Sequence, residues 1–369
     1  MKKTVALFTA VLLLCSLLAG CGAPPTANTP APQPAQPAAS GEPAAPVVEM
    51  EDLGVAITIG TPHANVAVIA EEKGYFAEVG IIPDLQPYVG GTAMMEALPS
   101  GAWDICVVAI PGWIPGTVNH DVRIVGLGPW DHDGIDLSVR PDSDIALSGQ
   151  GNYPDNPLIY GTADDWRGKS VLLPIGTPSH MTLLATLEAI GLTGDDVQIT
   201  NMDVPSAFTA FKAGQGDILG SWTLHSVYAK EEGYVLASSA VATGVDIPII
   251  ICASDRIMNE NPGLVEKYLI AYGKAAEYQQ NNHEEAAQIM ADWNNDQGFK
   301  TDVDSCYALV STRFTDPYSV QLEQFQNGKI VDIARYNLDF FIRTGRYEEE
   351  IWEIMERNIV SDILERVVN

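Results

Sequence analysis

The tetrapeptide Ile-Gly-Thr-Pro occurs twice in the chain, at residues 59–62 and 175–178, in the strings ITIGTPHANV and LLPIGTPSHM. Each copy follows an apolar, β-prone run and precedes a predicted helix. Threonine is a favoured N-cap residue and proline suits the first helical position. The first N–H groups of a helix have no partner within the helix and carry partial positive charge. Both copies could therefore bind a polar or anionic group.

Two further features favour a binding role for these joints. The third helical positions hold Ala64 and His180, so the Glu or Gln of a capping box is missing and the helix starts stay open to a ligand. A third joint, VGGTAMME, places Gly90 and Gly91 before Thr92, which lets the backbone approach a bound group closely. The alternative is that Gly-Thr-Pro is only a good helix start that recurs by chance.

The elements that must position these joints alternate between strand and helix. VAITI, IIPDLQPYV and WDICVVAI are predicted strands of a first unit, and KSVLLPIG, VQITNMD and DILGSW of a second. This alternation predicts an α/β fold with mostly parallel sheets flanked by helices. After Pro262 the pattern is almost wholly helical. We expect one lobe at residues 53–147 plus 246–369 and a second lobe at residues 148–245, because a stretch rich in Gly, Pro, Asn and Asp from Pro141 to Pro157 indicates the first boundary.

The N-terminal residues have the pattern of an export signal. A basic pair precedes an apolar run, and Leu-Ala-Gly-Cys then ends at Cys21, so residues 1–20 are predicted to be a lipoprotein signal peptide. Cleavage would leave Cys21 to carry diacylglycerol; the alternative is an ordinary secretory signal with a chance cysteine. Residues 21–52 are rich in Pro and Ala and are predicted to be a tether. The chain is therefore expected on the outer face of a bacterial cytoplasmic membrane.

Composition narrows the functional classes. The formal net charge of −28 argues against a nucleic-acid partner. Cys106, Cys252 and Cys306 are scattered, and two of them lie in apolar runs, which indicates buried free thiols rather than a disulfide framework. The histidines lack metal-ligand spacing, and no nucleophile elbow or phosphate loop is present, so we expect no metal, no cofactor and no enzyme activity.

A family resemblance supports this interpretation. The segment DDWRGKSVLLPIGTPSHMTLLATLEAIGLTGDDVQITNMDVPSAFTAFKAGQGDILGSW is similar to the second-lobe core of nitrate/sulfonate/taurine-type substrate-binding proteins of ABC importers. EEKGYFAEVGI, LPSGAWDICVVAIP and NPGLVEKYLIAYGKAAEYQQNNHEEAAQIMADW match other parts of that pattern. The resemblance implies a two-lobed type II periplasmic-binding-protein fold that closes on a small ligand. The related pyrimidine synthases carry a cysteine-rich motif that this chain lacks.

The resemblance also implies the positions of the ligand contacts. They carry over to Thr61, Pro62, His63, Gly91, Thr92, Pro111, Trp113, Thr177, Ser179, His180 and Trp222. Trp130, Asp131 and Asp246 are added as candidates because an aromatic wall or a carboxylate could face a cationic group. Each has an ordinary alternative: a buried structural histidine, a core tryptophan, or an aspartate that caps a turn.

The resulting hypothesis is a monomeric binding lipoprotein that delivers a small molecule to an ABC permease and its ATPase. The predicted cleft loops contain no Lys or Arg, so an anion would depend on helix N-termini, hydroxyls and protonated histidine. Taurine or another alkanesulfonate fits these donors best, and a nearby aspartate could pair the ammonium of taurine. A guanidinium compound or a pyrimidine is the alternative ligand. A pyrimidine-synthesis-like enzyme and a ligand sensor are the alternative classes.

Overall fold

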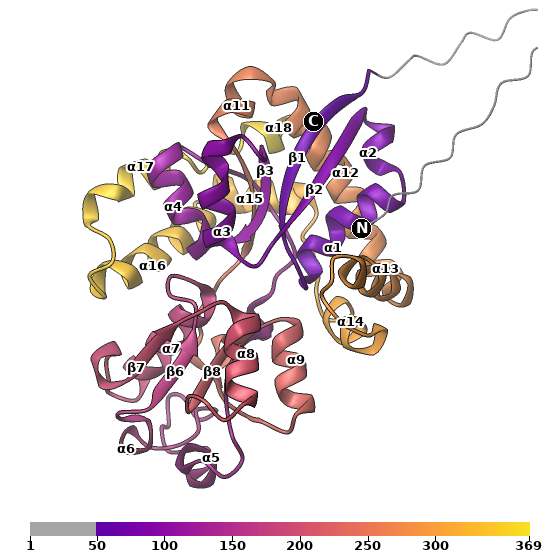
Figure 1. Ribbon diagram of the computed structural model, residues 1–369. Helices are drawn as coiled ribbons and strands as arrows, with labels where there is room; N and C mark the ends of the chain where they lie inside the picture. Colours follow the sequence, from indigo (N-terminus) through magenta and orange to yellow (C-terminus); the bar gives the residue numbers. More distant parts are fainter. Residues whose placement is uncertain (1–48) are drawn as a thin grey trace, which may run out of the picture. The chain divides into compact units, whose positions relative to one another are not determined.

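The computed structural model describes residues 49–369, and these fold around two five-stranded sheets (Figure 1). The first sheet has the strand order β2-β1-β3-β10-β4. Its strands are β1 (Glu51–Thr58), β2 (Ile81–Tyr88), β3 (Ile105–Ala109), β4 (Arg123–Leu127) and β10 (Ile249–Ala253). The second sheet has the order β7-β6-β8-β5-β9. Its strands are β5 (Ile135–Val139), β6 (Ser170–Leu173), β7 (Gln198–Asn201), β8 (Ile218–Trp222) and β9 (Val235–Ser239). We call the units built on these sheets the first and the second lobe.

Each sheet is mixed, and the antiparallel strand is the one that enters from the other lobe. β10 runs antiparallel to β3 and β4, and β5 runs antiparallel to β8 and β9. The remaining pairs, β1 with β2 and β3, and β6 with β7 and β8, are parallel. The predicted two-lobed α/β fold is confirmed, whereas the sheets are less parallel than the alternation of elements indicated.

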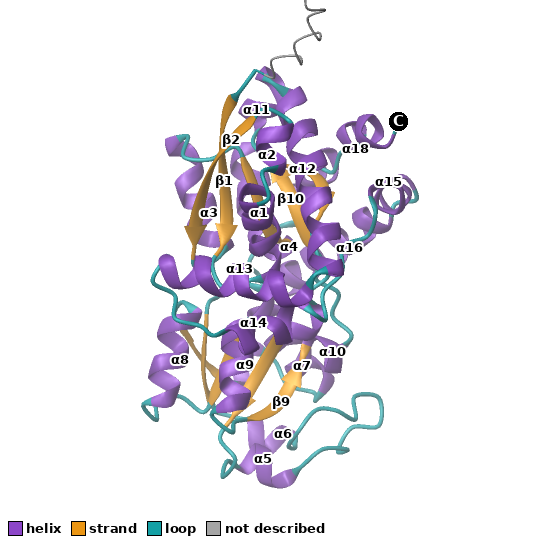
Figure 2. Cartoon of the chain, turned by 90° about the vertical axis from the view of Figure 1, so that its right-hand side faces the viewer, coloured by secondary structure: helices purple, strands orange, loops and turns teal. Residues whose placement is uncertain are grey.

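Helices cover both faces of each sheet. Figure 1 shows α3 and α4 on one side of the first sheet, with α1 and α12 on the other, and Figure 2 shows α8 and α9 across the second sheet from α7 and α10. The first-lobe helices before the crossing are α1 (Pro62–Glu72), α2 (Tyr75–Glu78), α3 (Gly91–Ala97) and α4 (Ile110–His120). The second-lobe helices are α5 (Asp144–Ser148), α6 (Ala163–Trp166), α7 (Pro178–Ala189), α8 (Val204–Lys212), α9 (Leu224–Glu231) and α10 (Ala240–Thr243). Short 3-10 turns occur at Leu98–Ser100, His132–Gly134, Gly194–Asp196 and Glu349–Ile351.

The C-terminal region is helical, as predicted. Its helices are α11 (Asp255–Glu260), α12 (Pro262–Asn281), α13 (His283–Asp296), α14 (Val303–Val310), α15 (Tyr318–Gln326), α16 (Lys329–Arg343), α17 (Trp352–Arg357) and α18 (Asp362–Val368). Most of their apolar side chains join the core around the first sheet. Phe340 of α16 instead packs into the core of the second lobe, so this helix contacts both lobes.

The chain crosses between the sheets after β4, through residues 128–134, and returns after α10 through residues 244–248. The return agrees with the predicted limit at residue 246, but β5 already pairs in the second sheet, upstream of the limit predicted at residue 148. The Gly- and Pro-rich stretch that suggested the earlier boundary is a surface loop around α5 and α6. The first hinge segment is therefore GPWDHDG.

The predicted signal peptide, Cys21 and most of the predicted tether lie outside the described residues. Within residues 49–369, no helix is long and apolar enough to cross a membrane.

Candidate functional site

The two Ile-Gly-Thr-Pro copies form the same turn in the two lobes. Gly60 and Gly176 both have left-handed backbone angles, with φ of 74° and 79°, a region that glycine enters without steric cost. Thr61 Oγ1 donates to the carbonyl oxygen of Thr58, and Thr177 Oγ1 donates to that of Pro174, each over 2.6 Å. One copy connects β1 to α1 and the other connects β6 to α7. Each threonine hydroxyl donates its proton within its own turn. The groups left to bind a ligand are therefore mainly the backbone N–H groups at the start of α1 and α7.

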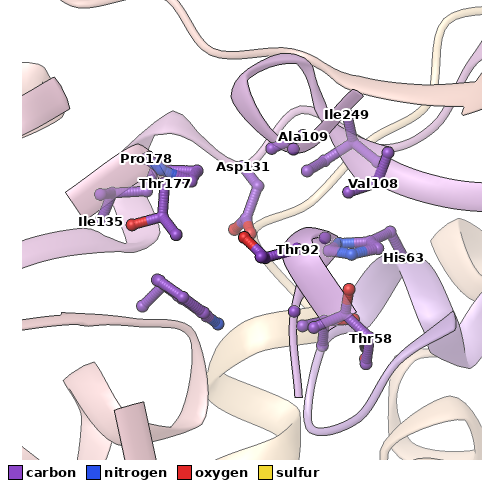
Figure 3. A pocket seen from close by; sticks show the side chains of 15 residues that line it. Thr58, His63, Thr92, Val108, Ala109, Asp131, Ile135, Thr177, Pro178 and Ile249 are labelled. Atoms are coloured by element: carbon purple, nitrogen blue, oxygen red, sulfur yellow. Dashed lines mark hydrogen bonds between the residues drawn. The ribbon is translucent and has the colours of Figure 1, made fainter. Parts of the chain in front are cut away.

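Both turns contribute to one pocket at the ends of the strands (Figure 3). The space not filled by atoms is about 510 Å³. We call this pocket the cleft. It is lined by Thr58, Thr61, His63, Gly90, Gly91, Thr92, Val108, Ala109, Gly112, Asp131, Ile135, Thr177, Pro178, Trp222 and Ile249. α1 and α4 of the first lobe and α7 of the second begin at this pocket, which is the expected position of a ligand in open α/β sheets.

Close packing between α3 and α4 brings the loop with Gly90 and Gly91 to the cleft. A β-carbon on Gly91 would lie 2.7 Å from a methyl carbon of Val108 and 2.8 Å from the α-carbon of Gly112. Both distances are shorter than a van der Waals contact, so a side chain at Gly91 would push α3 away from α4. The glycine therefore serves the packing that brings Thr92 to the cleft.

The cleft lining contains two titratable side chains, His63 and Asp131. Asp131 is buried in the first hinge segment, and Nε of Arg313 lies 2.6 Å from its Oδ1. Arg313 is itself buried and also pairs with Asp133, at 2.9 Å. The guanidinium therefore neutralises the carboxylate that lines the cleft. Arg313 lies between α14 and α15, in the helical region where the sequence offered no sign of a role near the ligand.

His63 is buried at the second position of α1, and neither ring nitrogen has a hydrogen-bond partner among the described residues. Burial, and after it the nearby charge of Arg313, lowers the pKa of His63 to about 3. Its imidazole is therefore neutral at pH 7, with one donor and one acceptor. Tyr272 holds the backbone of this residue by donating its hydroxyl to the His63 carbonyl, at 3.0 Å. Unpartnered polar atoms at a pocket wall are suited to bind a ligand.

His180 does not line the cleft, in contrast to the prediction. Its Nδ1 accepts the backbone N–H of Gly176 over 3.2 Å, and its ring stacks on Phe341 of α16 at 6.3 Å. Burial, and after it the charge of Arg346, lowers the pKa of His180 to about 4. Neither His180 nor His63 thus supplies the positive charge that the sequence suggested. The reason is tertiary: the C-terminal helix α16 packs against this end of α7.

Seven of the predicted contacts meet at the cleft, and they are Thr61, His63, Gly91, Thr92, Asp131, Thr177 and Trp222. The remaining seven are outside its lining: Pro62, Pro111, Trp113, Trp130, Ser179, His180 and Asp246. Trp113 is a core residue whose indole donates to the Val122 carbonyl at 2.7 Å, and Trp130 donates to Asp316 at 3.1 Å. Asp246 lies in the return crossing at residues 244–248, and its backbone carbonyl accepts a hydrogen bond from Asn337 of α16.

Sequence reasoning missed the apolar wall of the cleft. Val108 and Ala109 end β3, Ile135 begins β5 and Ile249 begins β10. Such residues resemble ordinary strand residues in a sequence. Their one signal is position, since they lie at or next to the end or the start of a strand. No group of His, Cys, Asp and Glu in residues 49–369 has a metal-binding arrangement.

Comparisons with known proteins agree with this architecture. The family model described as NMT1/THI5 like matches residues 155–286. An ABC transporter periplasmic binding protein of Brachyspira hyodysenteriae is 28% identical over 299 residues, which cover 81% of this chain and 83% of that protein. An aliphatic sulfonates-binding protein of Bacillus subtilis is 22% identical over 373 residues, covering 99% of this chain and 98% of the relative.

Solved structures share the fold at lower identity. The alkanesulfonate-binding protein SsuA from Xanthomonas axonopodis pv. citri, bound to MOPS, superposes with a TM-score of 0.69 at 15% identity, covering 85% of this chain and all of SsuA. The nitrate-binding protein NrtA from Synechocystis gives a TM-score of 0.66 at 15% identity, covering 87% of this chain and 89% of NrtA. Two lobes, two hinge crossings and a cleft between helix starts define the type II periplasmic-binding-protein fold. The chain is similar to the NMT1/THI5-like proteins over residues 155–286 and to a periplasmic binding protein of an ABC transporter over most of its length.

Proposed function

We propose that this substrate-binding component captures a short alkanesulfonate and delivers it to an ABC permease. The observation that carries the proposal is that helix starts from both lobes, α1 and α7, line one pocket whose lining includes no Lys or Arg. A sulfonate spreads its single charge over three oxygens, so several neutral N–H donors suit it. These donors line a pocket, where their dipoles act more strongly than in bulk water.

The apolar wall supports an organic rather than an inorganic anion. Val108, Ile135, Ile249 and Trp222 face the same pocket as the helix starts. A short carbon chain on this wall would contribute about 0.8 kcal/mol for each buried methylene. Nitrate or sulfate would leave the wall in contact with water, so both should bind more weakly.

The state of Asp131 favours a simple alkanesulfonate over taurine. Arg313 already lies against this carboxylate, so the ammonium of taurine would compete with a buried guanidinium for it. We therefore expect ethanesulfonate to bind more tightly than taurine, its amino analogue.

A neutral heterocycle such as a pyrimidine is the second candidate. The observation that favours it is the uncharged His63 ring, whose donor and acceptor could match an amide or amidine edge. Trp222 would then lie against the ring of the ligand.

The similarity to periplasmic binding proteins and the N-terminal sequence together support a cellular role. We propose that the protein works outside the cytoplasmic membrane, held there through lipid on Cys21, and that the permease and ATPase subunits are its partners.

The deciding experiment is calorimetric titration of residues 49–369 with ethanesulfonate, butanesulfonate, taurine, nitrate, guanidinium and a pyrimidine. Tight binding of the two alkanesulfonates with weaker binding of taurine and nitrate supports the proposal. Binding of the pyrimidine alone would replace it with the second candidate. Binding of guanidinium alone would contradict both.

A further inference from the structure

Trp222 separates the cleft from a second hollow on the surface, which we call the outer groove. The outer groove has about 620 Å³ of space not filled by atoms, and Glu96, Asn201 and Asp203 are among its lining residues. Five residues line both spaces: Gly90, Gly91, Thr92, Thr177 and Trp222. Among these five, only Trp222 has a large side chain.

The indole of Trp222 spans the two lobes at this point. Trp222 ends β8 of the second lobe, and its ring carbon Cζ2 lies 3.7 Å from where a β-carbon of Gly90 in the first lobe would be. It is only half-buried, and its indole N–H donates no hydrogen bond to another residue within 49–369. The ring is therefore held by packing and by the direction of its backbone.

That direction depends on a strained residue. Thr223 has φ 47° and ψ −122°, close to the first central position of a type II′ turn, where glycine dominates. A β-branched residue with this φ is a true outlier. Thr223 is buried, its N–H donates to the Gly134 carbonyl of the first hinge segment at 2.9 Å, and its own carbonyl accepts from Ser226 and Val227 at the start of α9. Backbone strain of this kind persists where the surroundings hold it, often at ligand sites.

We propose that Trp222 is a gate that limits the length of the ligand tail and that Thr223 is its positioning residue. The proposal rests on the proposed function, because it assumes a ligand whose head group is bound at the helix starts. The tail then points along the apolar wall and ends at the indole. The preferred ligand class is therefore a short-chain sulfonate, and longer tails are excluded because they would have to displace the ring toward the outer groove.

The first test compares methane-, butane- and octanesulfonate by calorimetric titration on the wild-type protein, Trp222→Phe and Trp222→Ala. The wild type should prefer butanesulfonate over octanesulfonate. Trp222→Ala joins the two spaces, and each methylene that becomes buried adds about fourfold in affinity, so the preference should shift toward octanesulfonate by at least tenfold. Trp222→Phe should shift it less. An unchanged preference in Trp222→Ala overturns the gate.

The second test examines Thr223 with the pair Thr223→Gly and Thr223→Ala. In an ordinary extended or helical position alanine is the more stabilising residue of the two. At a positive φ the order should reverse, so Thr223→Gly should melt at a higher temperature than Thr223→Ala. Thr223→Gly should nevertheless lose part of the length preference, because the indole is held less firmly. A lower melting temperature for Thr223→Gly than for Thr223→Ala would contradict the strain.

A measurement without ligand separates this inference from the proposed function. Acrylamide quenching of the wild type minus that of Trp222→Phe reports the accessibility of Trp222. The corresponding difference between Thr223→Gly and the double variant Thr223→Gly/Trp222→Phe should be larger, because a less firmly held indole is more accessible to acrylamide. If no alkanesulfonate binds the wild type, the proposed function fails, and this quenching difference still decides whether Thr223 positions the ring: an unchanged value overturns that role.

Discussion

Replacing His63 by leucine should stabilise the empty protein and weaken ligand binding. Both ring nitrogens are buried without a partner in the described chain, and each unsatisfied buried polar group costs about 1–3 kcal/mol. Leucine has no polar atom that must lose its water on folding, so the free energy of unfolding should rise by about 1–3 kcal/mol. A hydrogen bond from the ligand to the ring contributes about 1 kcal/mol, so the dissociation constant should rise roughly five- to tenfold.

The pH dependence of stability gives this prediction a second, independent readout. The pKa of His63 is about 3 in the folded state against an ordinary value of 6.5. Between these values the unfolded chain binds a proton that the folded chain does not, so protonation favours unfolding. The stability from neutral His63 is fully present above pH 6.5 and is lost as the pH falls toward 3. One such proton changes the free energy of unfolding by up to about 1.4 kcal/mol per pH unit.

The assay is urea unfolding followed by circular dichroism at pH 7, 6 and 5, with calorimetric titration of butanesulfonate at pH 7. His63→Leu should reduce the pH slope by close to one proton. His180→Leu is the matched control, because it removes an equally buried ring at the start of the equivalent helix. Since His180 accepts the Gly176 N–H and lies outside the cleft, this variant should lose stability at pH 7 and keep its affinity. A less stable His63→Leu with unchanged affinity would show that His63 is an ordinary core residue and would refute the reasoning.

Three further predictions concern the hinge, the first turn and the membrane anchor. Arg313→Met should destabilise the fold by about 3–5 kcal/mol because it removes the guanidinium beside buried Asp131. Adding Asp131→Asn should restore part of that loss in urea unfolding, and no recovery in the double variant would argue against the ion pair as the cause. Asn294→Ala should cost about 1–3 kcal/mol, since Asn294 Oδ1 accepts the buried Gly60 N–H over 2.8 Å; an unchanged melting temperature would contradict this. Cys21→Ala should move the protein from the membrane fraction to the soluble fraction without changing affinity, and retention on membranes at high salt would reject the lipid anchor.

The repeated turns could be predicted because their determinants are local. A glycine that tolerates positive φ, a threonine that bonds its own turn and a proline at the first helical position are all within a few residues of one another. Thr61, His63 and Thr177, which belong to these two turns and the helix starts behind them, therefore meet at one cleft. Strand and helix alternation likewise predicted two lobes and a helical C-terminal region.

Local sequence patterns could not predict that β5 belongs to the second sheet. The run GIDLSVR has the same apolar pattern whether it pairs beside β4 or beside β8 and β9. Pairing partners are chosen by the packing of residues far apart in sequence. The loop composition after Arg140 indicated a boundary, but the chain had already crossed at Gly128–Gly134.

The amino-acid sequence by itself determined the fold class and the two equivalent helix starts, since these depend on local backbone preferences and on periodic burial of apolar side chains. Only the tertiary structure decided the charge and the walls of the cleft. Arg313 reaches Asp131 across 182 positions of the chain, α16 covers His180, and burial keeps His63 neutral. The charge state of a side chain and its access to a ligand depend on which distant segments exclude water from it, and a local pattern contains no information on that.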